Sequence, residues 1–215
     1  MEHKGLRHKT PPAPEWGLMM AGEARAALIA LFLFAGAAHA SPILVAQGEA
    51  PPLPAWTGFC EEHPAECRQN RREPETVAAT PELLELVDAV NRYVNRTILP
   101  VTDRDRLGVI DNWDYPIDTM GDCEDIQLLK RRYLVEAGVP HRSLPMTVVL
   151  DEVGEGHAVL TVRTDREDLI LDNKNNHVKR WHETGYTYIK REGDTATGWV
   201  FLEARTTPVT TVAAQ

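Results

Sequence analysis

The 215-residue chain has no excess of positive charge and no internal repeat. It carries 23 Lys and Arg residues against 32 Asp and Glu residues, which gives a formal net charge of −9. Sequence-independent nucleic-acid binding needs clustered Lys and Arg to displace counterions, so this balance argues against a nucleic-acid-binding protein. With 43% hydrophobic and 26% charged residues, the composition is typical of one compact domain with appendages and excludes a fully disordered chain.

The N-terminal part also lacks an apolar run long enough to cross a bilayer comfortably. The run that follows Arg25 ends at Ala35, whereas a membrane-spanning helix needs about 20 apolar residues. Small residues then lead to Ala38-His39-Ala40, an A-x-A cleavage pattern. We therefore predict that residues 1–40 are a signal peptide, with Met19 or Met20 as the true start, and that the mature protein is not inserted in the membrane. The alternative is an uncleaved N-terminal anchor.

Cysteine is scarce, with Cys60, Cys67 and Cys123 alone. In an exported chain two of the three can pair, and the segment between Cys60 and Cys67 is short and contains Pro64, which favours a turn. We predict a disulfide between them. A zinc site formed by Cys60, His63 and Cys67 is the alternative, but it has no evident fourth ligand. Cys123 then remains a free thiol, which calls for an explanation in an oxidising compartment.

Two amphipathic helices are predicted after an extended, disulfide-containing lead-in at residues 41–80. Thr80 is a good N-cap and Pro81 suits the first helical position, and an apolar stripe follows over residues 81–97. The polar, turn-rich segment 100–120 is expected to be a structured loop. A second helix is predicted from the acidic run at residues 121–125 to about Ala137, with Gly138 in the left-handed cap position.

The rest of the chain alternates in the manner of strands joined by short connections, which favours an antiparallel sheet and an α+β fold. The folded domain is expected to span residues 81–205, and the small, polar residues 206–215 are expected to fray. The predicted strands are Met146–Leu150, Gly156–Arg163, Asp168–Asp172, Tyr186–Lys190 and residues 199–202.

Cys123 is predicted to lie in the first turn of the second helix. If Asp122 is the N-cap, Asp125 follows three residues later as in a capping box. The unpaired amides and the helix dipole there favour an anion, so a thiolate forms more easily. The alternative is a buried structural cysteine beside acids that only cap the helix.

His157 and Asp172 supply the other groups that a cysteine nucleophile needs. A hairpin that turns between Thr164 and Asp165 places His157 directly opposite Asp172 on one face, with β-carbons about 4.5–5.5 Å apart. A thiol, a histidine that accepts its proton and a carboxylate that orients the histidine can cleave an amide through an acyl-enzyme. The alternative is a surface His–Asp pair unrelated to the cysteine.

Three short runs of the sequence resemble the bacterial transglutaminase-like cysteine peptidases, which include the LapG-type periplasmic proteases. These runs are Gly-Asp-Cys-Glu-Asp at 121–125, Gly-His-Ala-Val-Leu at 156–160 and Leu-Ile-Leu-Asp-Asn at 169–173. The resemblance spans about residues 56–205. It implies a papain-like core with N-terminal helices packed on an antiparallel sheet, and a catalytic triad of Cys123, His157 and Asp172.

The resemblance also implies a periplasmic endopeptidase that cleaves a protein substrate such as a surface adhesin and is held by an inner-membrane receptor for a cyclic dinucleotide. It implies Ca²⁺ binding by Asp122, Glu124 and Asp125. A physical argument points the same way: these carboxylates raise the pKa of the neighbouring thiol, and a hard divalent cation would offset their charge. Two other functions remain open, namely acyl transfer to an amine and a noncatalytic periplasmic binding or regulatory module.

Overall fold

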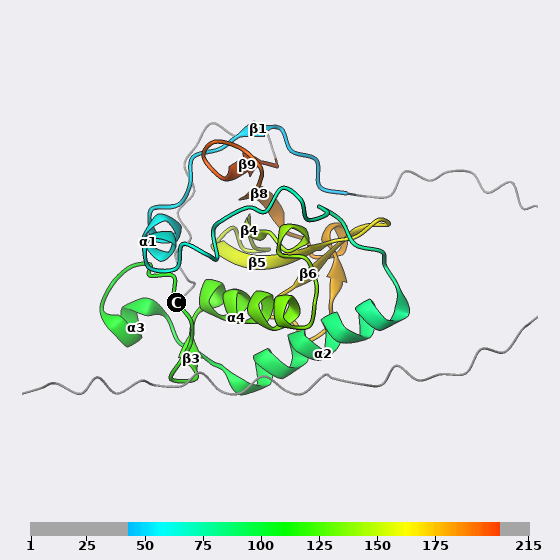
Figure 1. Cartoon of the computed structure of the whole chain (residues 1–215). Coiled ribbons are helices and arrows are strands. Elements are labelled where there is room, and N and C mark those ends of the chain that lie inside the picture. Colours follow the sequence, from blue (N-terminus) through cyan, green and yellow to red (C-terminus); the bar gives the residue numbers. More distant parts are fainter. Residues whose placement is uncertain (1–42, 203–215) are drawn as a thin grey trace, which may run out of the picture.

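The computed structural model describes residues 43–202, whose central element is a seven-stranded sheet (Figure 1). The strand order is β1-β9-β8-β4-β5-β6-β7, and every neighbouring pair is antiparallel, as predicted. The strands are β1 (Gly48–Glu49), β4 (Met146–Leu150), β5 (Gly156–Arg163), β6 (Asp168–Leu171), β7 (Lys179–Arg180), β8 (Thr187–Glu192) and β9 (Trp199–Phe201). The predicted signal peptide and the predicted C-terminal tail lie outside the described residues.

The helices are arranged in layers on one face of the sheet. Helix α4 packs against β5, and α2 packs on α4, so that α4 lies between the sheet and α2 (Figure 1). The α-helices are α1 (Pro54–Glu62), α2 (Pro81–Thr97), α3 (Asp103–Leu107) and α4 (Cys123–Glu136). The shorter elements are the parallel pair β2 (Leu99–Pro100) and β3 (Met120–Gly121) and the 3-10 turns η1 (His141–Ser143) and η2 (Trp181–Glu183). Within residues 43–202, no helix combines the length and hydropathy needed to span a bilayer.

Helix α2 has the bounds that its sequence predicts. The Thr80 side chain accepts a hydrogen bond from the backbone N–H of Leu83 at 3.2 Å, which satisfies one of the unpaired amides of the first turn. Val87, Val90 and Val94 are fully buried against the core. The apolar stripe therefore fixes both the helix and the face that it buries.

Helix α4 begins where predicted, but the predicted capping box is wrong. Asp122 occupies the N-cap position and makes no capping hydrogen bond. Its carboxylate instead accepts the backbone N–H of Asp103, and the Asp125 carboxylate accepts that of Asp114. These acids therefore hold the preceding segment against the helix rather than cap the helix. The helix ends as predicted, with Gly138 at φ 95°.

Two segments that were predicted to lack secondary structure contain it. Within the predicted lead-in, β1 pairs with β9 and α1 buries Phe59, although α1 has no sustained apolar stripe. Within the predicted loop at 100–120, α3 forms with Thr102 as its N-cap. Both helices are short and are held by tertiary contacts, which the local sequence pattern does not report.

The predicted register of the β5–β6 hairpin is wrong by two residues. Leu160 pairs with Leu171 and Thr161 with Ile170, because the Thr164 hydroxyl accepts the N–H groups of two following residues and displaces the turn. Because side chains alternate with a period of two, this shift leaves every face assignment intact. His157 and Asp172 are therefore diagonal neighbours on one face instead of direct partners.

The sheet buries apolar side chains on both faces. The larger cluster lies between the sheet and α4 and includes Leu160, Leu171 and the fully buried Trp199. A smaller cluster on the opposite face includes Val159 and Ile170. The hairpin thus lies between other elements, as the apolar character of both its faces predicts.

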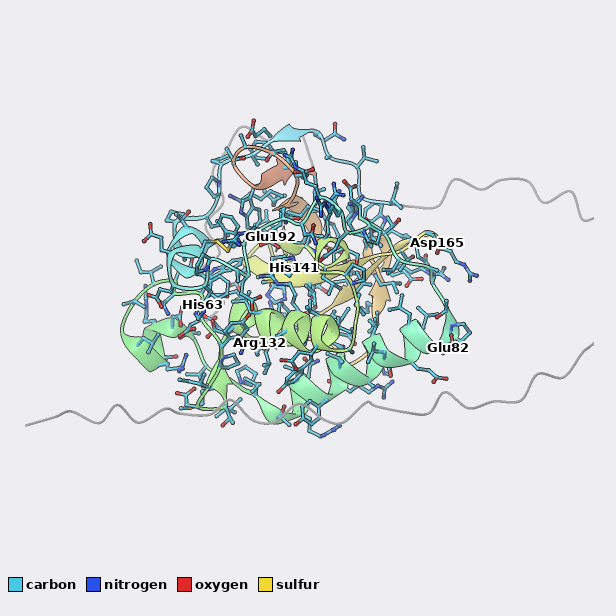
Figure 2. The ribbon with its side chains drawn as sticks, viewed as in Figure 1. His63, Glu82, Arg132, His141, Asp165 and Glu192 are labelled. Atoms are coloured by element: carbon cyan, nitrogen blue, oxygen red, sulfur yellow. A yellow bond between two sulfur atoms is a disulfide. The ribbon has the colours of Figure 1, made fainter. Side chains whose placement is uncertain are left out.

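Cys60 and Cys67 form the disulfide that the sequence favours, with their Cα atoms 5.6 Å apart (Figure 2). Cys123 is the remaining cysteine, and it is free and buried. His63 makes a hydrogen bond to Asp114 at 3.3 Å. The disulfide loop therefore packs against the segment that leads into α4.

Candidate active site

Cys123 is the first residue of α4, and its side chain faces strand β5. The residue is 5% exposed, and its thiol donates a hydrogen bond to Glu124 Oε2 at 3.0 Å. The backbone amide of Ala158 in β5 acts to lower the pKa of the thiol, which places it close to the sulfur. Because Ala158 directly follows His157, the sulfur lies beside the part of the strand that carries the histidine.

His157 and Asp172 are joined by a hydrogen bond between Nε2 and Oδ1 at 2.9 Å, and both residues are buried. The Asp172 carboxylate also accepts the Tyr186 hydroxyl at 2.6 Å and the backbone N–H of Lys174 at 2.9 Å. Burial alone raises the pKa of Asp172, but the hydrogen bond and charge of His157, together with the Tyr186 and Lys174 hydrogen bonds, outweigh it and lower the pKa to about 2. Asp172 is therefore an anion at neutral pH.

The ionised carboxylate determines which nitrogen of His157 is available for chemistry. A carboxylate can only accept hydrogen bonds, so Nε2 of His157 carries a proton and Nδ1 is left to accept one. The Cys123 thiol donates its hydrogen bond to Glu124. Within residues 43–202, it makes no hydrogen bond to His157. The structure thus brings His157 and Asp172 together and places Cys123 against the same strand.

Tyr186 is a site residue that the sequence reasoning missed. Its ring meets that of His157 edge-on with centroids 5.9 Å apart, and burial and the hydrogen bond to Asp172 raise the pKa of its hydroxyl, which keeps the hydroxyl a donor. Tyr186 directly precedes β8, a central strand, and Tyr188 is the second residue of that strand. The available sequence signal was the Tyr-x-Tyr pattern of Tyr186 and Tyr188 at the start of a predicted strand.

The predicted metal-binding residues belong to a larger group of five carboxylates, which we call the acidic cluster. One oxygen each from Asp103, Asp111 and Glu124 lie within 4.8 Å of one another, as do oxygens from Asp103, Asp122 and Asp125. The sequence reasoning missed Asp103 and Asp111, although the density of aspartates between residues 103 and 114 was a signal. The acidic cluster therefore joins the first turn of α4 to the segment that precedes it.

Burial makes the acidic cluster electrostatically unfavourable by itself. It raises the pKa of Glu124 and of Asp125 well above the usual range, aided by repulsion from Asp122, and it raises the pKa of Asp103 to about 6. Burial, followed by repulsion from Glu124 and Asp122, also raises the pKa of the Cys123 thiol. Burial and the neighbouring carboxylates thus hold the thiol in its protonated form.

The donor atoms of the acidic cluster fit a hard divalent cation. Asp103 Oδ1 and Asp122 Oδ1 are buried and accept no hydrogen bond from any residue of the described part of the chain. Ca²⁺ takes six to eight oxygen ligands, mostly from carboxylates and carbonyls, so a compact set of buried carboxylate oxygens matches its chemistry. Positive charge at this position would also relieve the repulsion within the cluster.

The comparison with known families decides the class of the protein. A model described as the bacterial transglutaminase-like cysteine proteinase family matches residues 46–207. The chain belongs to this family. It is therefore a cysteine peptidase, and its α+β architecture of helices on an antiparallel sheet is the transglutaminase-like fold.

Solved structures also resemble this cysteine peptidase. One of Legionella pneumophila LapG is 26% identical, with a TM-score of 0.47, and the match covers 58% of this chain and 71% of that chain. The calcium-bound form of Legionella pneumophila LapG is 25% identical, with a TM-score of 0.48, and the match covers 64% of this chain and 77% of that chain. A search of curated proteins finds no match.

Proposed function

We propose that this cysteine peptidase is a periplasmic, calcium-dependent endopeptidase that cleaves a protein substrate with Cys123 as nucleophile, His157 as base and Asp172 as the orienting carboxylate. The observation that carries the proposal is the 2.9 Å hydrogen bond between His157 and Asp172, with His157 on strand β5, against which α4 and its Cys123 pack. A paired base and carboxylate beside a thiol at a helix N-terminus supply the groups that cysteine peptidases need.

In the proposed reaction, Asp172 keeps the Nε2 proton of His157 in place and Nδ1 takes the proton of the Cys123 thiol. The thiolate attacks the carbonyl carbon of the scissile amide, and the backbone N–H of Cys123 contributes to stabilising the oxyanion. His157 then protonates the leaving amine. Water hydrolyses the acyl-enzyme with the same histidine as base, which returns the thiol.

The acidic cluster explains why the activity would need calcium. Asp122, Glu124 and Asp125, with Asp103 and Asp111 beside them, would hold the ion, which supplies positive charge next to the thiol. Positive charge there would weaken the hydrogen bond by which Glu124 accepts the thiol proton at 3.0 Å. The thiol proton would then be available to His157.

The location and the partners are part of the same proposal. A disulfide such as Cys60–Cys67 persists in oxidising compartments, and the apolar run before Ala38-His39-Ala40 is typical of export signals. The resemblance to the LapG-type proteases supports a surface adhesin as substrate and an inner-membrane receptor for a cyclic dinucleotide as partner.

The first test compares surface and secreted proteins after incubation with the purified peptidase and with its Cys123→Ala variant. We expect new protein N-termini, detected by mass spectrometry, with the unchanged enzyme and none with the variant at an equal thermal midpoint. Retained cleavage by Cys123→Ala would overturn the proposed triad. Ammonia release with isopeptide formation, in place of new N-termini, would assign acyl transfer instead.

The second test concerns calcium. Excess chelator is expected to abolish cleavage and added Ca²⁺ to restore it, and Asp103→Asn is expected to raise the Ca²⁺ concentration needed for half-maximal activity. Asp88→Asn, on the exposed face of α2, is the matched control and should behave like the unchanged enzyme. Full activity in excess chelator, with no bound metal by elemental analysis, would refute the calcium requirement.

A further inference from the structure

A polar pocket lies at the end of the sheet away from His157. Its volume is about 230 Å³, and Arg142, Arg163 and Arg191 are among the residues that line it. Strand β5 carries His157 near its first residue and Arg163 as its last. At about 3.3 Å per residue, the two positions are about 20 Å apart along the strand, so the pocket is separate from the candidate active site.

Arg191 is the unusual member of this pocket. It lies on β8 opposite Thr147 and is 6% exposed. Within residues 43–202 its guanidinium donates no hydrogen bond and forms no ion pair, and its Nε is buried without a partner. Burial and the nearby charge of Arg163 lower the pKa of Arg191 to about 10, although Asp168 and Glu75 act in the opposite direction. A buried cation costs free energy unless an anion pairs with it.

Two of the carboxylates that line the pocket are already paired with other arginines. Glu75 accepts from Arg142 at 2.6 Å and from Arg163 at 3.1 Å. Asp194 accepts from Arg71 at 2.7 Å and from Arg142 at 3.2 Å. These pairs fix the wall of the pocket, and in the described part of the chain neither carboxylate forms an ion pair with Arg191.

The other nearby acids are also engaged elsewhere. Glu192 lines the pocket, but its Oε2 accepts from the buried Arg131 at 2.6 Å. Asp168 lies near enough to influence Arg191 but forms no ion pair with it within the described residues, and its Oδ2 accepts the backbone N–H of Leu44. Within residues 43–202, Arg191 lines the pocket and has no carboxylate partner.

We propose that this pocket binds a small oxyanion, a phosphate or carboxylate group, through the guanidinium of Arg191. The fork of an Arg side chain matches two oxygens of such a group. A volume of about 230 Å³ accommodates a phosphate ion or a short carboxylic acid. The proposal is independent of the proposed triad, because neither Cys123 nor His157 takes part in it.

The test measures thermal unfolding of the purified protein in phosphate, in acetate and in chloride at equal ionic strength. Phosphate or acetate is expected to raise the midpoint by about 2–4 °C over chloride, and the arm with the larger shift identifies the preferred group. Arg191→Met should lose the shift and, without ligand, should unfold no earlier than the unchanged protein, because a buried unpaired charge is removed. The exposed Arg96→Met is the matched control and should keep the shift.

Equal unfolding midpoints in phosphate, acetate and chloride would overturn the proposal. An unchanged shift in Arg191→Met would overturn it as well. Calorimetric titration of the unchanged protein with phosphate and with acetate gives a readout that does not depend on folding of the variant. Saturable heat in either titration supports the site, and heat equal to dilution in both rejects it. Arg191→Lys, which keeps the charge without the fork, should bind more weakly than the unchanged protein.

Discussion

In the proposed mechanism, the chemistry of His157 depends on Asp172. Its carboxylate fixes the Nε2 proton and thereby leaves Nδ1 as the acceptor. Asp172→Asn is expected to lower kcat/KM by about 10²–10⁴-fold, because an amide permits the wrong tautomer and does not stabilise the imidazolium. Peptide-cleavage kinetics check this, with the exposed Asp88→Asn as a control that should keep normal activity. A loss of less than about fivefold would remove Asp172 from the mechanism.

The lowered pKa of Asp172 also predicts how stability depends on pH. The folded-state pKa of about 2 lies below the ordinary value of 3.8, so the stability from ionised Asp172 is fully present above pH 4 and is lost as the pH falls toward 2. The shift corresponds to about 2 kcal/mol. In urea unfolding, the stability difference between the unchanged protein and Asp172→Asn should be constant from pH 5 to 8 and shrink below pH 4. A constant difference down to pH 2.5 would contradict the assignment.

At the level of single residues, the sequence predicted those parts of the site that lie on regular elements. Cys123 and His157 could be placed because α4 and β5 have strong periodic patterns. Tyr186 and Asp103 could not be placed, because each reaches the site through contacts between segments far apart in the chain. Tyr186 meets Asp172 across the sheet, and the backbone of Asp103 meets Asp122 across a loop.

Helix α2 is stabilised at its start by a single capping residue. The Thr80 hydroxyl accepts the N–H of Leu83, and no other side chain of the described chain makes this contact. Thr80→Ala is therefore expected to lower the free energy of unfolding by about 1 kcal/mol without changing kcat, because α2 lies behind α4 and away from the thiol. Urea unfolding and kinetics check both parts. Thr80→Ser, which keeps the hydroxyl, should cost less than half as much.

At the level of elements, the sequence predicted the helices and strands that have a repeating apolar pattern. It missed the strand register that depends on a single turn. The bounds of α2, β4 and β5 agree with the prediction because each is set by apolar periodicity and nearby turn formers. The register of β5 against β6 depends on how Thr164 closes the turn, a local geometry without a clear composition signal. Since the error was an even number of residues, the predicted faces were still correct, and His157 and Asp172 lie on the same one.

At the level of the whole molecule, the pairing of distant strands was beyond local sequence patterns. Strand β8 pairs with β4 and with β9, so the C-terminal strands extend the β4–β5–β6 meander on its β4 side. Glu192, the last residue of β8, connects this strand to three other elements. It accepts from Arg131 of α4, from the indole N–H of Trp56 in α1 and from the backbone N–H of Met146 in β4.

This junction predicts the site at which a single substitution most affects global stability. The side chains of Arg131 and Glu192 are 0% and 1% exposed, so Glu192→Gln would leave a buried guanidinium without its counter-charge. We expect a loss of about 3–5 kcal/mol in the free energy of unfolding, because an uncompensated buried charge cannot be hydrated. Glu183→Gln, which loosens a solvent-exposed pair with Arg180, is the control and should change stability by less than about 1 kcal/mol. Comparable losses in both variants by urea unfolding would show that Glu192 does not have this central role, whereas a large loss for Glu192→Gln alone would show that α1, α4 and the sheet unfold together.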